Sequence, residues 1–331
     1  MRFGLLSGIL WGLDTVILGI GMAMAPYVGS AEAMAFASIV GSFLHDALCA
    51  IWLLVYMGAR HRLGDTLAAL RTRSGKVVML GALLGGPIGM TGYVIAIANL
   101  GAAYTAIISA FYPAFGAALA FLLLKEKMGR GQIVALFVAL FGVMAMGLLS
   151  AGDSQIVNAP IGLLGAALTV VGWGSEAVLC AWGMRDDNVD DETALHIRET
   201  TSALVYGIVV LPLSGAWGFA AQAAPSAATG FIALAGLAGV ASYLFYYRGI
   251  SAIGAAKAMA LNISYSAWAV VFGLLLLGTV PTPATVACCV AIVAGTVLAA
   301  SDWGEFWRPD GPLNQWMQVA RFCACFSCIE T

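Results

Sequence analysis

Charged residues are scarce in this chain: Asp, Glu, Lys and Arg make up 10% of its 331 residues, against roughly 25% in soluble globular proteins. The net charge is −2, and no tract of Lys and Arg offers the basic surface that nucleic-acid binding requires. Hydrophobic residues reach 61%, more than a soluble protein of this length can remove from water. These values exclude a soluble nucleic-acid-binding protein and predict that the lipid bilayer is the partner of most of the surface.

Signatures of ATP use and of common hydrolases are also missing. No G-x-x-x-x-G-K-[ST] loop occurs, so no P-loop binds ATP. No H-E-x-x-H motif and no Cys/Ser–His arrangement is visible. The C-x-C-x-x-C sequence of Cys323, Cys325 and Cys328 lacks the second Cys pair or His cluster that a metal site needs. We expect no cofactor and no metal.

Long apolar runs are abundant instead. About 20 apolar residues cross the hydrocarbon core as a helix. By that measure the sequence predicts an all-α integral membrane protein with ten transmembrane helices. They lie at about 3–25, 33–57, 77–97, 101–124, 132–150, 160–183, 198–221, 227–248, 252–278 and 282–301.

The distribution of basic residues predicts the orientation of these helices. The connection 58–76 holds five Lys and Arg residues, which favours the cytoplasmic side. With ten spans, all fifteen basic residues, Arg198 among them, fall on that side. We therefore expect both termini in the cytoplasm of a bacterial inner (plasma) membrane. No Lys or Arg occurs in the opposite connections 26–32, 98–100, 151–159, 222–226 and 279–281.

Two alignments of the chain with itself indicate an internal repeat. A shift of 153 residues places Tyr93 on Tyr246, Tyr112 on Tyr265 and the Gly-Ala-Ala run 101–103 on 254–256. A shift of 162 places Trp11-Gly12-x-Asp14 on Trp173-Gly174-x-Glu176. We expect two five-helix repeats, residues 1–150 and 160–301, followed by a cytoplasmic or interfacial tail, 302–331. Because five is odd, the second repeat is inverted relative to the first, as in many secondary transporters.

The stretch TAIISAFYPAFGAALAFLLLKEKM, residues 105–128, resembles the signature of the drug/metabolite transporter superfamily in its EamA-type two-repeat form. Within it, the chain is similar to the YddG-type branch of bacterial inner-membrane exporters of aromatic amino acids. The resemblance implies ten helices, two inverted repeats and export of amino acids or similar metabolites. The second repeat departs from the signature, with Ser266 in place of Pro113 and Thr279 in place of Glu126.

Asp14 and Glu176 are acids inside apolar runs, each on one helical face with an indole, Trp11 or Trp173. A carboxylate that faced lipid would cost roughly 2.5–3.5 kcal/mol on insertion scales, so both should face the interior or a wet cavity. Binding of a substrate ammonium or proton coupling is one interpretation. A protonated acid that only joins helices by a hydrogen bond is the other.

Further polar and aromatic residues are candidates for the same cavity. His45 is able to relay protons near neutral pH, and an equally simple role is a structural hydrogen bond. Aromatic rings bind cations or aromatic ligands, although most membrane aromatics are packed or interfacial. Gly86 and Pro87 indicate a hinge in the third helix, and Glu126 indicates an intracellular gate or a charged turn. The remaining candidates are Tyr93, Tyr112, Tyr246, Asn262, Tyr265 and Trp268.

The combined prediction is a secondary transporter that moves a small metabolite, most simply an aromatic or other neutral amino acid, by alternating access and in the direction of export. The cavity should lie among the first, third, fourth, sixth, eighth and ninth helices. One alternative is an intramembrane enzyme that uses His45 with Asp14 or Glu176. Another is a receptor or scaffold without flux. The sequence does not indicate an oligomeric state.

Overall fold

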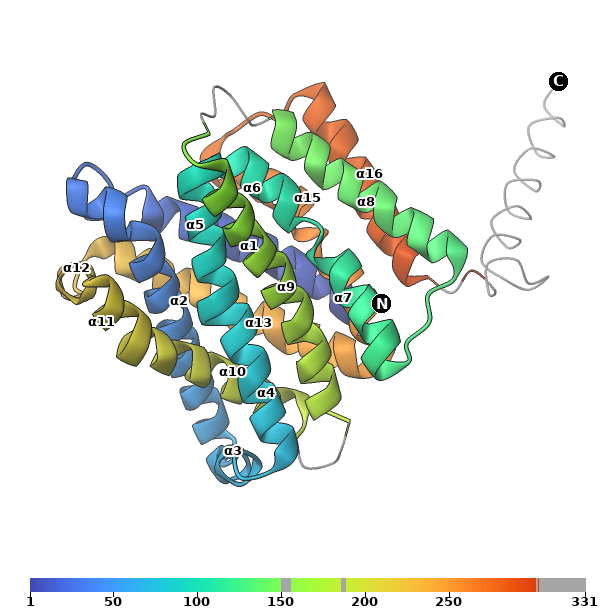
Figure 1. Cartoon of the computed structure of the whole chain (residues 1–331), viewed down its shortest axis with the longest axis horizontal. Coiled ribbons are helices and arrows are strands. Elements are labelled where there is room, and N and C mark those ends of the chain that lie inside the picture. Colours follow the sequence, from blue (N-terminus) through green and yellow to red (C-terminus); the bar gives the residue numbers. More distant parts are fainter. Residues whose placement is uncertain (150–155, 186–188, 302, 304–331) are drawn as a thin grey trace, which may run out of the picture.

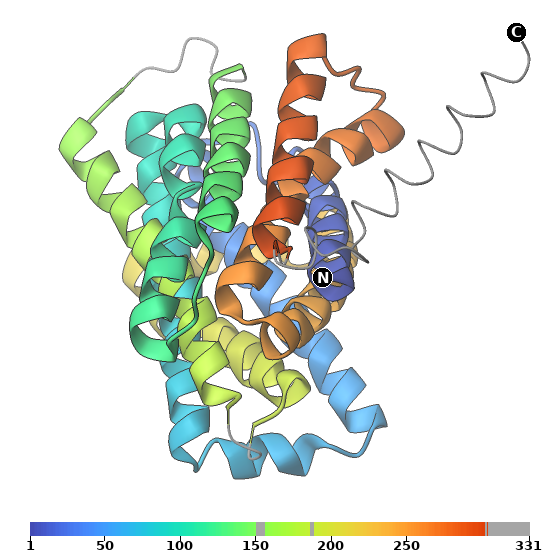
Figure 2. The same ribbon diagram turned by 90° about the vertical axis from the view of Figure 1, so that its right-hand side faces the viewer.

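The computed structural model describes residues 1–149, 156–185, 189–301 and 303, and every regular element among them is a helix. The expected tail, 302–331, with its three cysteines lies outside the described residues except for Trp303. Figures 1 and 2 show a bundle of long helices with short turns at both ends. The all-α prediction is confirmed.

Residues before the gap at 150–155 form nine helical elements. They are α1 (Arg2–Met22), α2 (Ala31–Ala59), α3 (Leu63–Ala69), α4 (Arg73–Leu83), the π-helical η1 (Leu84–Met90), α5 (Thr91–Leu100), α6 (Ala102–Ser109), α7 (Tyr112–Leu124) and α8 (Arg130–Leu149).

Residues after that gap form nine more. They are α9 (Ala159–Gly183), α10 (Asp191–Val205), the π-helical η2 (Tyr206–Val210), α11 (Leu211–Ser214), α12 (Trp217–Ala223), α13 (Ala227–Ile253), α14 (Ala255–Asn262), α15 (Tyr265–Leu277) and α16 (Pro283–Ala300).

Within the described residues, nine helical stretches are long and apolar enough to cross a membrane. They correspond to nine of the ten predicted spans. The predicted span 198–221 is the exception: the helix here begins at Asp191 and, through η2 and α11, continues to Ser214. Its first turns carry too many charges to qualify by hydropathy alone. Arg198 therefore does not lie in a cytoplasmic connection, as predicted, but is 5% exposed within the bundle.

The helix boundaries repeat along the chain with the same shift of 153 residues. Ala102–Ser109 and Tyr112–Leu124 in the first part correspond to Ala255–Asn262 and Tyr265–Leu277 in the second. The preceding turn contains a glycine with positive φ in both parts: Gly101 at 83° and Gly254 at 87°. Pro113 helps to start α7, yet α15 starts at the equivalent place with Ser266. The break between the two short helices therefore does not depend on proline.

The first helix of each part packs against the other part of the chain. α1 lies against α13, α14 and α15, and α9 lies against α4, η1, α5 and α7. Small residues permit this approach: a Cβ on Gly12 would meet Trp268 Cβ at 2.7 Å, and one on Gly174 would meet Phe115 Cδ1 at 2.7 Å. α8 and α16 pair at the right of Figure 1, away from this centre.

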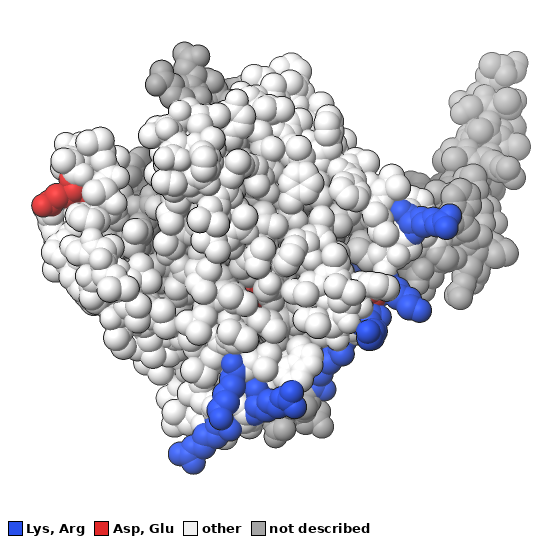
Figure 3. Space-filling model, viewed as in Figure 1, with Lys and Arg blue, Asp and Glu red and all other residues white. Residues whose placement is uncertain are grey.

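Charge is distributed unevenly over the surface. On the face shown in Figure 3, Lys and Arg gather along the lower and right-hand edge, and the upper part of that face carries none. The short helix α3 marks the lower end in Figure 1. This distribution agrees with the excess of basic residues that cytoplasmic connections carry.

Candidate functional site

A cavity of about 270 Å³ lies where α1, α2, η1, α5, α7, α9, α10, α13, α14 and α15 converge. None of its lining residues comes from α8 or α16. Asn262 and Tyr265 flank the break between α14 and α15, and Tyr112 follows the break between α6 and α7. Helices interrupted within the membrane are typical of transporter binding sites, because the break frees polar groups and opens space.

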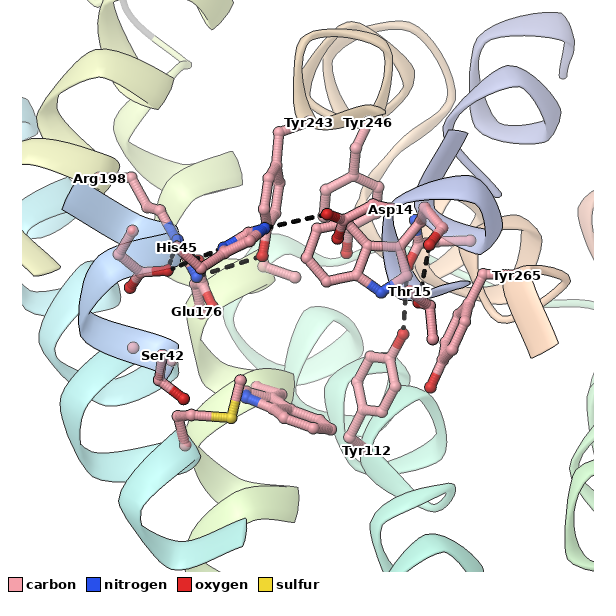
Figure 4. A pocket seen from close by; sticks show the side chains of 18 of the residues that line it. Asp14, Thr15, Ser42, His45, Tyr112, Glu176, Arg198, Tyr243, Tyr246 and Tyr265 are labelled. Atoms are coloured by element: carbon pink, nitrogen blue, oxygen red, sulfur yellow. Dashed lines mark hydrogen bonds and ion pairs between the residues drawn. The ribbon is translucent and has the colours of Figure 1, made fainter. Parts of the chain in front are cut away.

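Aromatic rings form much of the cavity wall (Figure 4). The Trp11 indole meets the Tyr243 ring edge-on, with centroids 4.8 Å apart. The Trp173 indole lies 5.3 Å from the ring of Tyr93 and 5.7 Å from that of Tyr112. Each of the two matched tryptophans therefore sits in a cluster of tyrosines. Such walls attract ammonium groups through the negative faces of the rings.

Each of the two matched acids pairs with a base on the helix that follows it. Asp14 Oδ1 on α1 lies 3.0 Å from His45 Nε2 on α2. Glu176 Oε1 on α9 accepts a 2.6 Å hydrogen bond from Arg198 Nε on α10. Figure 4 shows both pairs side by side at the cavity. The structure therefore shows partners for Asp14 and Glu176 that the sequence did not reveal.

Asp46 joins these two pairs into one network. Its Oδ1 lies 3.5 Å from His45 Nδ1 and 3.9 Å from Arg198 Nη1, and its Oδ2 accepts a 2.6 Å hydrogen bond from the Ser202 hydroxyl. Both nitrogens of His45 thus face carboxyl oxygens. Arg198 also donates to Glu199 at 2.8 Å, and its guanidinium stacks over the Tyr243 ring at 4.8 Å.

Carboxyl groups outnumber bases in this network. Four of them, from Asp14, Asp46, Glu176 and Glu199, face one guanidinium and one imidazole. No side chain in the network is more than 12% exposed. Among the described residues, Glu199 Oε2 is buried without a hydrogen-bond partner. Unpaired buried charge is costly, so a bound cation or bound protons would lower the electrostatic free energy of this network.

The sequence carried an unused signal for Arg198 and Glu199. The shift of 153 residues that aligns the tyrosines also places His45-Asp46 on Arg198-Glu199. The dipeptides occupy equivalent places on α2 and α10 and face the same network. The match was missed because the seventh helix was predicted to start at Arg198, whereas α10 begins seven residues earlier, at Asp191.

Ten of the eleven predicted cavity residues lie on the cavity wall. Trp268 is the exception and corrects the prediction: its Cβ faces Gly12, and its indole N–H is buried with no hydrogen-bond partner among the described residues. The close approach of α1 to α15 is made by the Cβ and backbone of Trp268. The ten on the wall are Trp11, Asp14, His45, Tyr93, Tyr112, Trp173, Glu176, Tyr246, Asn262 and Tyr265.

The predicted hinge lies in the π-helical segment η1. Gly86 lines the cavity, whereas Pro87, although inside η1, does not. A Cβ on the neighbouring Gly85 would collide with the carboxylate of Glu176. Only glycine at this position lets α9 bring Glu176 to Arg198. π-helical turns often mark functional sites, and this one lies against the ion network.

Glu126, the predicted gate residue, lies outside the cavity. Its two carboxylate oxygens accept hydrogen bonds of 3.0 Å from the backbone N–H groups of Ala255 and Ala256. The side chain of the first part thus caps α14 of the second part, where a negative charge stabilises the helix N-terminus. The role of Glu126 as an intracellular gate stays a prediction.

A second ion network lies at the end of the bundle that carries the connection 58–76. Glu192, whose side chain is 5% exposed, accepts hydrogen bonds from Arg60 at 2.7 Å, Arg62 at 2.6 Å and Arg248 at 2.8 Å. Arg62 also pairs with Asp190. Burial alone raises the pKa of Asp190, but hydrogen bonds from the Thr193 N–H and Arg62 prevail and hold that pKa below its usual value. This pair therefore contributes stability above about pH 4 and loses it as the pH falls further.

We expect Glu192→Gln to lower the free energy of unfolding by about 2 kcal/mol, because the amide replaces charge-assisted bonds and turns its NH2 group towards arginines. Thermal melting of the purified protein in detergent measures the effect. Asp65→Asn is the matched control: its side chain is 53% exposed and pairs with Arg62 alone, so we expect at most about 0.5 kcal/mol. Equal melting shifts for both variants would contradict the role of Glu192.

In the part of the chain that the structure describes, nine candidate spans, helices throughout and a polar cavity between two repeated parts form the architecture of a membrane transporter. The chain belongs to the EamA-like transporter family, which matches residues 1–148 and 160–301 and therefore occurs in it twice. It is a multi-pass membrane protein and a secondary transporter of small molecules, not an enzyme. The resemblance to the EamA-type form of the superfamily is confirmed, whereas the YddG-type branch stays a prediction.

Two individual proteins extend the comparison. Protein LicB of Haemophilus influenzae (strain Rd) is 30% identical over 229 residues, which cover 68% of this chain and 75% of LicB. A protein of known crystal structure is 17% identical and superposes with a TM-score of 0.66, over 90% of this chain and 96% of that one. At that identity the second likeness shows a shared fold alone.

Proposed function

We propose that this protein carries a small organic cation across the inner membrane by alternating access. The observation that carries the proposal is the composition of the cavity: its wall combines aromatic rings with three carboxyl groups and two bases, and Glu199 adds a fourth carboxyl group behind Arg198. A substituted ammonium group satisfies both features, because rings attract it and carboxylates neutralise it. With no P-loop in the sequence, an ion or substrate gradient supplies the energy.

The proposed topology has ten spans in two inverted five-helix halves. The continuous helix from Asp191 to Ser214 is the seventh span, in spite of its charges, because Arg198 and Glu199 face partners inside the bundle. Both termini then lie in the cytoplasm, on the side of the Glu192 network. The two acid–base pairs, one from each half, face the shared cavity from opposite repeats.

An aromatic or other neutral amino acid, exported from the cell, is the second candidate. It follows from the resemblance to the YddG-type branch, and Arg198 offers a cation for its carboxylate. Arg198 already pairs with Glu176 and Glu199, however, so a zwitterion has to displace an acid from it. This competition favours a substrate with a net positive charge.

Uptake into proteoliposomes distinguishes the candidates. We expect purified protein in sealed vesicles to take up radiolabelled tetramethylammonium faster than protein-free vesicles do, with saturation, and to take up phenylalanine at the background rate. Saturable phenylalanine uptake without cation uptake would overturn the proposal in favour of the amino-acid transporter. Specific binding of either compound without flux would instead indicate a receptor.

A further inference from the structure

A second chamber, of about 300 Å³, lies beside the cation cavity. Tyr93, Tyr112, Trp173 and Tyr265 line both spaces, so four aromatic rings form the wall between them. Trp173 contacts the rings of Tyr93 and Tyr112 on this wall. The two spaces are therefore neighbours with a common aromatic wall, and rotation of these side chains would join them without a shift of the helices.

The second chamber lies towards the outer membrane surface. On α8 it is lined by Val143, Met146 and Gly147, at the opposite end of that helix from the basic turn that includes Arg130. Ala106 and Ser109 line it from the second half of α6.

The chemistry of the two spaces differs. The second chamber has no Asp, Glu, Lys, Arg or His among its lining residues, and aliphatic side chains cover much of it. The hydroxyl of Ser109 already donates to the Ala106 carbonyl at 3.2 Å. Such a chamber is unsuited to a second cation and suited to an apolar group, because removal of methylene groups from water is favourable there.

We infer that the transported cation is elongated, with its ammonium group among the acids of the first cavity and an apolar chain that extends past Trp173 into the second chamber. The inference rests on the proposed function and makes it narrower: amines with a linear alkyl or aryl substituent bind more tightly than compact ammonium ions. The aromatic wall is the passage between head group and chain. The chamber supplies the selectivity for chain length.

The test is a series of trimethylammonium compounds with methyl, butyl, hexyl and octyl substituents, which compete with labelled tetramethylammonium for uptake by proteoliposomes. We expect each methylene that reaches the chamber to strengthen competition about three- to fourfold. Val143→Trp and Ala106→Phe fill the chamber, so they should abolish this gain and leave tetramethylammonium uptake within about twofold of wild type.

Val138→Trp is the matched control, since Val138 is 45% exposed on the outward face of the same helix. Partitioning of long chains into lipid affects all variants equally, so only the difference between variants reports on the chamber. A chain-length gain that persists in both filled variants would overturn the inference. Absence of any gain in wild type, with tetramethylammonium still transported, would do the same and leave the proposed function intact. Absence of all cation transport would instead contradict the proposed function.

Discussion

Replacing Arg198 by methionine is expected to lower the free energy of unfolding by about 3–5 kcal/mol, the usual cost of breaking a buried ion pair. Arg198 is 5% exposed and is the only guanidinium within reach of Glu176, Glu199 and Asp46 among the described residues. Methionine keeps the apolar stem of the side chain but removes the guanidinium, which leaves Glu176 and Glu199 without a base and Asp46 with His45 alone.

Thermal melting of the purified protein in detergent measures this loss. Arg71→Met, at an exposed site, is the matched control and should melt within about 0.5 kcal/mol of wild type. The double variant Arg198→Met/Glu176→Gln should recover part of the stability, since it removes one of the uncompensated charges. If Arg198→Met melts like the control, the network does not hold the bundle together.

Asp14→Asn and Glu176→Gln are expected to reduce cation transport by about tenfold or more each, the equivalent of losing one charge-assisted contact of about 1.5–3 kcal/mol. Both changes preserve size and leave an amide oxygen for His45 or Arg198, so the folded yield should survive. Uptake of labelled tetramethylammonium, set against the yield of folded protein, measures the effect. Glu32→Gln, on the exposed first turn of α2, is the control without effect.

The two acid variants also separate the interpretations that the sequence left open. If the acids bind substrate, transport falls while melting changes little. If they only join helices, yield and transport fall together. We expect the pattern of a binding role in both variants, because each acid lines the cavity and does not point solely into the packed core.

Much of the cavity was predictable because a polar residue within an apolar run can be recognised from the sequence alone. Asp14 and Glu176 stood out in this way, and the repeated Trp-Gly placed Trp11 and Trp173 beside them. The Gly-Ala-Ala match likewise predicted the repeat that now appears as equal boundaries in α6–α7 and α14–α15. Each of these features can be found either within a short stretch of sequence or by aligning the chain with itself.

Residues that work through distant contacts were harder to find. Arg198 was taken for part of a cytoplasmic connection, because a charged first turn resembles a loop by hydropathy. Its partner Asp46 lies 152 positions away, so only the folded chain brings the two together. Trp268 was a cavity candidate because it is an aromatic residue in an apolar run, but its Cβ packs against Gly12 and the residue does not line the cavity.

Calorimetric titration of the purified wild-type protein with tetramethylammonium and with phenylalanine tests most directly whether the acidic aromatic cavity is a cation site. The account predicts saturable binding of tetramethylammonium, at least about tenfold or 1.4 kcal/mol tighter than phenylalanine, and its loss in the Asp14→Asn/Glu176→Gln double variant. Tighter binding of phenylalanine, or tetramethylammonium binding that the double variant retains in full, would contradict it.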